Sequence, residues 1–120
     1  MKTIVHHGEC GTAVQVVGHE AVLSSEQDVL DLMANADPDG QSRKLILSLN
    51  QIAPEFFDLS TGLAGAILQK ISNYSYQLAI IGDFSIYESE SLQAFIRESN
   101  RTGQVIFVPD LETAIGRFCS

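Results

Sequence analysis

The stretch KLILSLNQIAPEFFDLSTGLAGAILQKISNYSYQLAIIG, residues 44–82, contains two short apolar runs separated by one helical segment. Residues 44–49 and 78–82 have the length and composition of strands that are covered on both faces of a sheet. Between them, apolar side chains recur at helical spacing, which predicts a helix over residues 60–74. A strand, a helix and a second strand in this order form a right-handed crossover between parallel strands. The stretch therefore predicts an α/β fold built on a parallel sheet.

The C-terminal part of the chain continues this alternation. A loop over residues 83–89 leads to a helix that ends near residue 101, because apolar side chains recur there at helical spacing. A last strand follows over residues 104–108, and Asp110 is placed to cap a short terminal helix. This strand is again preceded by one helix, as a parallel sheet requires.

The N-terminal part begins with two strands of a different kind. Residues 3–7 and 13–18 are short and rich in Val and Ile, and the turn residues 8–11 between them have hairpin spacing. A helix over residues 29–36 follows. The element order is thus ββαβαβαβα, and we expect a mixed, mostly parallel sheet of about five strands in a single domain over residues 1–120.

Composition and charge exclude several classes of function. The chain has a formal net charge of −8, and its seven Lys and Arg residues form no patch, which argues against nucleic acid and anionic membranes as partners. No apolar stretch approaches the length of about 18 residues that a membrane span requires. The N-terminus does not read as a signal peptide. Cys10 and Cys119 lie near opposite ends of the chain and would be neighbours if the termini meet, but reduced cysteines are the expectation. We therefore expect a cytoplasmic protein.

Residues 58–62, Asp-Leu-Ser-Thr-Gly, open the predicted central helix and are the most suggestive motif. A hydroxyl at a helix N-terminus sees exposed N–H groups and the positive end of the helix dipole, an environment that stabilises a phosphate. Ser60 and Thr61 are therefore candidate phospho-acceptors. The alternative is that one of them only caps the helix, because Ser and Thr are ordinary residues at that position.

The order of elements resembles the fold of bacterial anti-sigma-factor antagonists and sulfate-transporter-associated (STAS) domains. Residues 45–68 resemble the central segment of that family, where Asp-Ser-Ser-Gly follows a buried strand. The resemblance implies a STAS-like regulatory domain in which the serine before the glycine accepts a phosphate on the surface that docks a partner kinase. Thr61 occupies that position and Ser60 corresponds to the preceding serine, while Leu59 is one residue extra.

A more specific resemblance extends from about Lys44 to the C-terminus. The runs FFDLSTGLAGAILQKISNY, LAIIGDFS and FIRESN are similar to an uncharacterised bacterial family, domain of unknown function 4180. That family brings no established activity. The resemblance does imply that residues 56–74 and 82–85 are the segments in which to look for function.

Polar residues also follow the predicted parallel strands, where α/β sheets place their ligand sites. Such a polar rim could bind a small ligand, although Asp and Ser are also common in ordinary loops. The Phe56-Phe57 pair is expected in the core, unless one ring is exposed beside Thr61 and anchors a partner. The candidate partner- or ligand-binding residues are Asn50, Phe57, Asp58, Gly62, Asp83, Phe84 and Ser85.

No catalytic or metal-binding signature accompanies these residues. His6 and His7 are consecutive and face opposite sides of a strand, and the chain lacks the Cys and His spacings of zinc sites. It also lacks a nucleophile elbow and a phosphate-binding glycine loop. We therefore expect no enzyme, no metal and no cofactor. The favoured hypothesis is a regulatory domain that binds a protein through the helix beginning near Ser60, and the alternative is a small-ligand-binding module.

Overall fold

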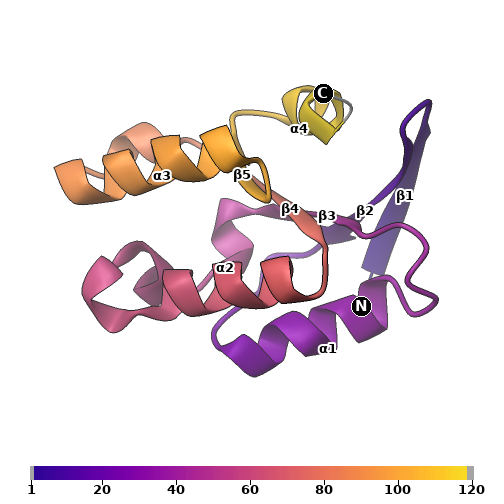
Figure 1. Ribbon diagram of the computed structural model, residues 1–120, viewed down its shortest axis with the longest axis horizontal. Helices are drawn as coiled ribbons and strands as arrows, with labels where there is room; N and C mark the ends of the chain where they lie inside the picture. Colours follow the sequence, from indigo (N-terminus) through magenta and orange to yellow (C-terminus); the bar gives the residue numbers. More distant parts are fainter. Residues whose placement is uncertain (1, 119–120) are drawn as a thin grey trace.

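The computed structural model describes residues 2–118 and has one five-stranded sheet with four α-helices (Figure 1). The strands are β1 (Lys2–Gly8), β2 (Gly11–Val17), β3 (Lys44–Ser48), β4 (Gln77–Ile81) and β5 (Val105–Val108). The helices are α1 (Glu26–Ala36), α2 (Leu63–Asn73), α3 (Glu90–Thr102) and α4 (Leu111–Phe118). The predicted α/β class and mixed sheet are confirmed.

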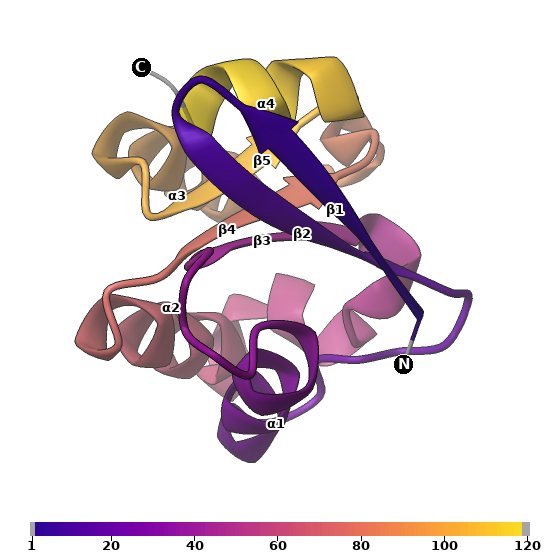
Figure 2. The ribbon, with the colours of Figure 1, turned by 90° about the vertical axis from the view of Figure 1, so that its right-hand side faces the viewer.

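The strands lie side by side in chain order, from β1 at one edge of the sheet to β5 at the other. β1 runs antiparallel to β2, with Lys2 opposite Val17 and Gly8 opposite Gly11, whereas β2 to β5 are parallel. Figure 2 shows the β1–β2 hairpin as a long ribbon across one side of the molecule, with its turn near α4. The carboxyl ends of the four parallel strands consequently lie at one end of the sheet.

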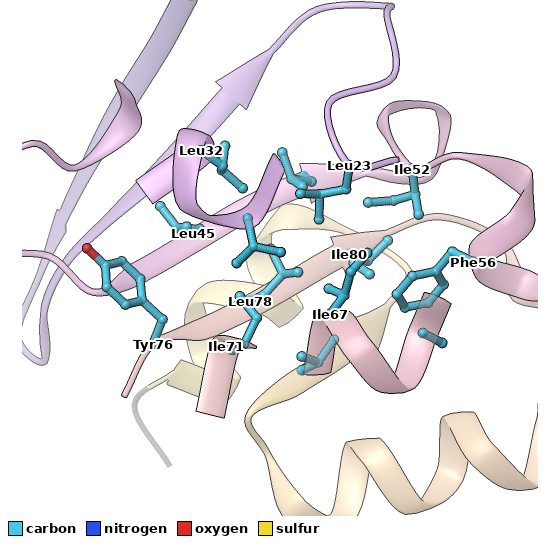
Figure 3. Close-up of a cluster of buried hydrophobic side chains, with 14 of the residues drawn as sticks. Leu23, Leu32, Leu45, Ile52, Phe56, Ile67, Ile71, Tyr76, Leu78 and Ile80 are labelled. Carbon is cyan, nitrogen blue, oxygen red and sulfur yellow. The ribbon is translucent and has the colours of Figure 1, made fainter. Parts of the chain in front are cut away.

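The two faces of the sheet are covered unequally. α1 and α2 lie together on one side of the sheet, and α4 lies on the other (Figure 1). The larger core lies under α1 and α2 (Figure 3), and its fully buried side chains include Leu23, Leu32, Leu45, Phe56, Ile67, Ile71, Leu78 and Ile80. The smaller core contains Ala13, Ile46, Ala79, Ile106 and Val108 of the sheet with Ala114 and Phe118 of α4. Burial of apolar surface on both faces explains why β3, β4 and β5 are apolar runs without alternation.

Side chains of α3 close the sheet edge at β5. The amide of Asn100 donates to the carbonyl of Phe107 (3.2 Å) and accepts from its N–H (2.7 Å), as a neighbouring strand would. The hydroxyl of Ser99 donates to the carbonyl of Val105. These bonds satisfy backbone groups that an edge strand otherwise leaves unpaired.

The start of α2 differs from the sequence-based expectation. The helix begins at Leu63 and not at Ser60, and Leu59–Thr61 form a separate 3₁₀ turn. Gly62 between them has φ 76°, a left-handed conformation that glycine adopts without steric cost and that a continuous helix does not allow. Ser60 and Thr61 therefore precede the helix and do not belong to its first turn.

A buried carboxylate joins the end of α1 to the start of β3 and β4. Asp37 is only 4% exposed and accepts hydrogen bonds from the N–H groups of Ser42 (3.1 Å) and Arg43 (3.0 Å) and from the hydroxyl of Tyr76 (2.8 Å). The guanidinium of Arg43 lies over the ring of Tyr76, 5.6 Å from its centre. This network holds the 37–43 connection against the core.

Two further expectations concern the termini and membranes. Cys10 is disulfide-bonded, so the expectation of a reduced thiol is wrong for this residue, and Cys119 lies outside the described residues. Among residues 2–118, no helix combines the length and the apolar character that crossing a bilayer demands.

Candidate functional site

The candidate site is formed by short 3₁₀ turns at the carboxyl ends of β3 and β4. Three of them, η1 (Leu49–Gln51), η2 (Pro54–Phe57) and η3 (Leu59–Thr61), connect β3 to α2, and η4 (Phe84–Ile86) follows β4. Pro54 opens η2 at a position where its missing N–H is not needed. The connections pack closely, because a Cβ atom on Gly82 would lie only 2.7 Å from the Cβ of Leu49.

Two of these turns share the sequence Asp-x-Ser and the same hydrogen bonds. The Asp58 carboxylate accepts from the N–H (3.1 Å) and the hydroxyl (2.6 Å) of Ser60. The Asp83 carboxylate accepts from the N–H (3.0 Å) and the hydroxyl (2.5 Å) of Ser85. These hydrogen bonds lower the pKa of both carboxyl groups, and the bond from the serine hydroxyl has the largest effect. Each carboxylate thus caps the start of its own 3₁₀ turn and finds its hydrogen-bond donors within that turn.

The hydroxyl of Thr61 fastens the neighbouring turns together. Its Oγ1 lies 2.8 Å from the carbonyl oxygens of Glu55 and Asp58, to one of which it donates, and it accepts from the N–H of Leu63 at 3.2 Å. Thr61 is exposed, as is Ser60. Thr61 therefore bonds to the first residue of α2 from outside the helix, whereas the N-cap position belongs to Gly62 and carries no side-chain cap, and Thr61 remains at the surface.

An aromatic cluster joins the turns after β3 to the turn after β4. The ring of Phe57 stacks on Tyr87 with 4.7 Å between centres and lies 6.2 Å from the ring of Phe84. Burial raises the pKa of the Tyr87 hydroxyl. Gln93 of α3 donates to the carbonyl oxygens of both Phe84 (2.8 Å) and Tyr87 (2.9 Å), which fixes η4 from the other side.

Phe57 was a candidate partner-binding residue, but it is only 8% exposed. Its ring supports the surface from within and is not available to a partner. The side chain of Ile86 is instead 62% exposed, the largest exposure among the large hydrophobic residues described. Exposed apolar surface at this edge therefore comes from η4.

The predicted polar rim does not converge on one cavity. An open hollow of about 410 Å³ lies beside Asp83 and Phe84 and is completed by Gly82, Phe107, Val108 and Pro109. Asn50 and Asp58 do not line it, and both are exposed elsewhere on the edge. Within residues 2–118, no group of three His, Cys, Asp or Glu side chains is placed to hold a metal ion.

The family model of a domain of unknown function, DUF4180, matches residues 10–118. The chain belongs to this family. No curated protein and no solved structure matches the chain significantly. The matched span of the DUF4180 domain contains all four 3₁₀ turns, so the candidate site is part of the family's domain.

Sequence reasoning missed two residues of this DUF4180 site, Ile86 and Tyr87. Both lie in the predicted loop over residues 83–89, where apolar side chains are unusual. The presence of an Ile and a Tyr in a short loop could have identified them, because loops are normally made of polar or turn-forming residues.

Proposed function

We propose that the DUF4180 domain is a non-enzymatic regulatory module that docks a protein partner. The docking surface consists of the exposed side chains of residues 54–62 and 83–87. The observation that carries this proposal is the exposure of Ile86, 62%, in the chain position next to Tyr87, whose ring stacks on that of Phe57. An apolar side chain on a turn that is held by ring stacking and by hydrogen bonds from Gln93 can enter a partner's pocket with little loss of backbone conformational entropy.

The surrounding polar groups support docking better than capture of a small ligand. The carboxylates of Asp58 and Asp83 are engaged by their own serines, so neither turns toward a common cavity. Small-ligand sites need a concave pocket with converging polar groups. A polar rim around an apolar centre is instead the usual arrangement of a protein interface.

Phosphorylation of Thr61 or Ser60 would alter this surface through the η3 turn. A phosphorylated Thr61 has no hydroxyl proton to donate to the carbonyls of Glu55 or Asp58. A phosphate on Ser60 would lie against the Asp58 carboxylate, which repels it. Either modification opens η3, and this accords with the resemblance to STAS regulators.

The docking proposal is tested by comparing immobilised wild-type domain with Ile86→Ser in an extract of the cells that produce the protein. A specific partner should bind the wild type and lose about tenfold or more in affinity to Ile86→Ser, since burying an Ile contributes about 1.5–3 kcal/mol. Ile4→Ser is the matched control, because Ile4 is 47% exposed on β1, away from the docking surface. If Ile86→Ser retains the partner as well as the wild-type domain does, the proposal is refuted.

The phosphorylation step has a separate test, intact-mass analysis of the protein isolated from its own cells. We expect a single phosphate that phosphatase removes and that Ser60→Ala with Thr61→Val abolishes. Ser85→Ala is the control, because Ser85 makes the same hydrogen bonds in the other Asp-x-Ser turn. A phosphate on Ser85, or none in growing, starved or stressed cells, would contradict this step and leave the docking experiment to decide the rest.

A further inference from the structure

A second hollow lies at the carboxyl end of β2, away from the docking surface. It has a volume of about 420 Å³ and is lined by Lys2, Val16, Val17, Gly18, His19, Glu20, Val22 and Gln51. None of these residues belongs to residues 54–62 or 83–87. We propose that this hollow binds a small molecule with a short apolar body and a carbonyl oxygen, which accepts a hydrogen bond from the side-chain amide of Gln51.

The amide of Gln51 is the chemical reason for this assignment. The residue is fully buried, and its Nε2 finds no hydrogen-bond acceptor among residues 2–118. The other atom of the amide is accounted for, because Oε1 accepts from the N–H of Ser48 at 2.8 Å. That bond fixes the orientation of the amide, since the reverse orientation would place two donors against each other. A buried donor without an acceptor destabilises the folded state, and a ligand that supplies the acceptor removes this penalty.

The unpaired nitrogen lies at the wall of the hollow. A Cβ atom on Gly18 would sit 3.8 Å from Gln51 Nε2, and Gly18 itself lines the hollow. Because Gly18 has no side chain, nothing from this residue fills the space beside the amide. The nitrogen therefore borders the hollow, but a water-sized atom does not reach it in this structure, so a ligand oxygen bonds to the donor through a small displacement of the amide or of Gly18.

The walls on either side of the amide are held in place by backbone hydrogen bonds. The carbonyl oxygen of Gln51 accepts from the N–H groups of Val22 (2.6 Å) and Leu23 (3.1 Å). The N–H of Ala53 donates to the carbonyl of Leu23 at 2.9 Å, so the two segments run as a short parallel bridge. A donor held in this way needs little reorganisation on binding.

The lining decides the class of ligand. Val16, Val17 and Val22 provide apolar contact, and the 38% exposure of Val17 leaves apolar surface for a ligand to cover. Lys2 and Glu20 also line the hollow and bring one positive and one negative formal charge, beside the imidazole of His19. The charges nearly balance, so the common requirement is the carbonyl oxygen, whether of a neutral amide or of a carboxylate. The position, beside the ends of two parallel strands, is one that α/β sheets use for ligands.

The first experiment titrates isotope-labelled protein with three six-carbon probes, hexanamide, hexanoate and hexylammonium, followed by ¹H–¹⁵N NMR. We expect hexanamide or hexanoate to shift the side-chain NH₂ signals of Gln51 saturably, and their relative affinities to distinguish a neutral from an anionic ligand. Hexylammonium has the same chain without an acceptor and should leave these signals unchanged. The NH₂ group of Gln93 is the internal control, since it already donates to two carbonyls.

The second experiment repeats the titration on variants. Gly18→Val places methyl groups in the hollow and should weaken binding of the carbonyl probe about tenfold or more. Gly18→Ala adds only a methyl in ordinary contact and serves if the valine variant unfolds, with a smaller loss expected. Gly65→Ala, on the exposed side of α2, is the control and should bind like the wild type. The proposal is overturned by the absence of a saturable Gln51 shift, by equal binding of hexylammonium, or by unchanged binding in both Gly18 variants.

Discussion

At the scale of single residues, Asp37 shows how the chain holds a charge in its interior. Burial by itself would raise the pKa of the Asp37 carboxyl, but hydrogen bonds from the N–H groups of Arg43 and Ser42 and from Tyr76, with the charge of Arg43, lower it overall. Burial and the hydrogen bond to Asp37 raise the pKa of Tyr76 to about 12. The pair is therefore an ionised carboxylate and a neutral phenol at every pH near neutrality.

Replacing this carboxylate should cost stability. In Asp37→Asn, one side-chain oxygen becomes an NH₂ donor that faces donors already present, so we expect a loss of about 1–3 kcal/mol in the free energy of unfolding at pH 7. Because the folded pKa lies below the unfolded value, this contribution is present above about pH 4 and is lost as pH falls through the folded pKa. Urea unfolding at pH 7 and pH 3 measures both effects.

Asp39→Asn is the control for this prediction, since Asp39 is exposed and its carboxylate accepts, among residues 2–118, from the N–H of Gln41 alone. It should change the free energy of unfolding by less than about 0.5 kcal/mol. Equal stabilities of Asp37→Asn and Asp39→Asn at pH 7 would show that the buried network contributes nothing.

At the scale of elements, the two glycines near the start of α2 have opposite roles. Gly62 caps the helix in the left-handed region, whereas Gly65 lies inside the helix, exposed and with open space where an added methyl group would point. Gly62→Ala should lower the free energy of unfolding by about 1–2 kcal/mol. Gly65→Ala should raise it by about 0.5–1 kcal/mol, because alanine is the better helix former.

Thermal or urea unfolding of the two variants beside the wild type checks both signs in one experiment. The pair is informative because the same methyl group is added three residues apart. Destabilisation by Gly65→Ala would mean that α2 packs against more than the described residues, and stabilisation by Gly62→Ala would mean that the helix extends back toward Ser60.

The elements themselves could be predicted well from the sequence, and the site less so. Apolar runs such as residues 44–49 identify buried strands because both faces of the sheet are covered. The start of α2 was misplaced because a left-handed Gly62 leaves no trace in the periodicity of apolar residues. The burial of Phe57 and the exposure of Ile86 depend on how two loops pack, and the unpaired amide of Gln51 depends on hydrogen bonds that only the folded chain defines.

At the scale of the whole molecule, the two edges of the sheet are unlike. β5 is covered by Asn100 and Ser99 of α3, whereas every described residue of β1 except His6 is exposed, and Ile4 and Val5 present 47% and 48% of their surface. The central strands β3 and β4 pair on both sides. The free energy of local opening should therefore decrease from the centre of the sheet toward β1, but not from the centre toward β5.

Amide hydrogen exchange tests this asymmetry. The amides of β3 and β4 should exchange only through global unfolding, those of β1 should exchange much faster, and the Phe107 amide should be protected despite its edge position. Asn100→Ala should remove that protection, whereas Asn73→Ala on the exposed end of α2 should not. Slow exchange throughout β1 would indicate that another chain covers this edge.

The stack of Phe57 on Tyr87 makes the loop after β3 and the loop after β4 one cooperative unit. Neither ring can leave without exposing the other, and an aromatic pair of this kind adds about 0.5–1.5 kcal/mol beyond burial. We therefore expect the fluctuations of the two loops to be correlated, although a whole helix and strand separate the rings along the sequence. A modification at Ser60 or Thr61 would change the fraction of molecules in which Ile86 is exposed. A covalent change in the loop after β3 would thus shift the conformational equilibrium of the loop after β4.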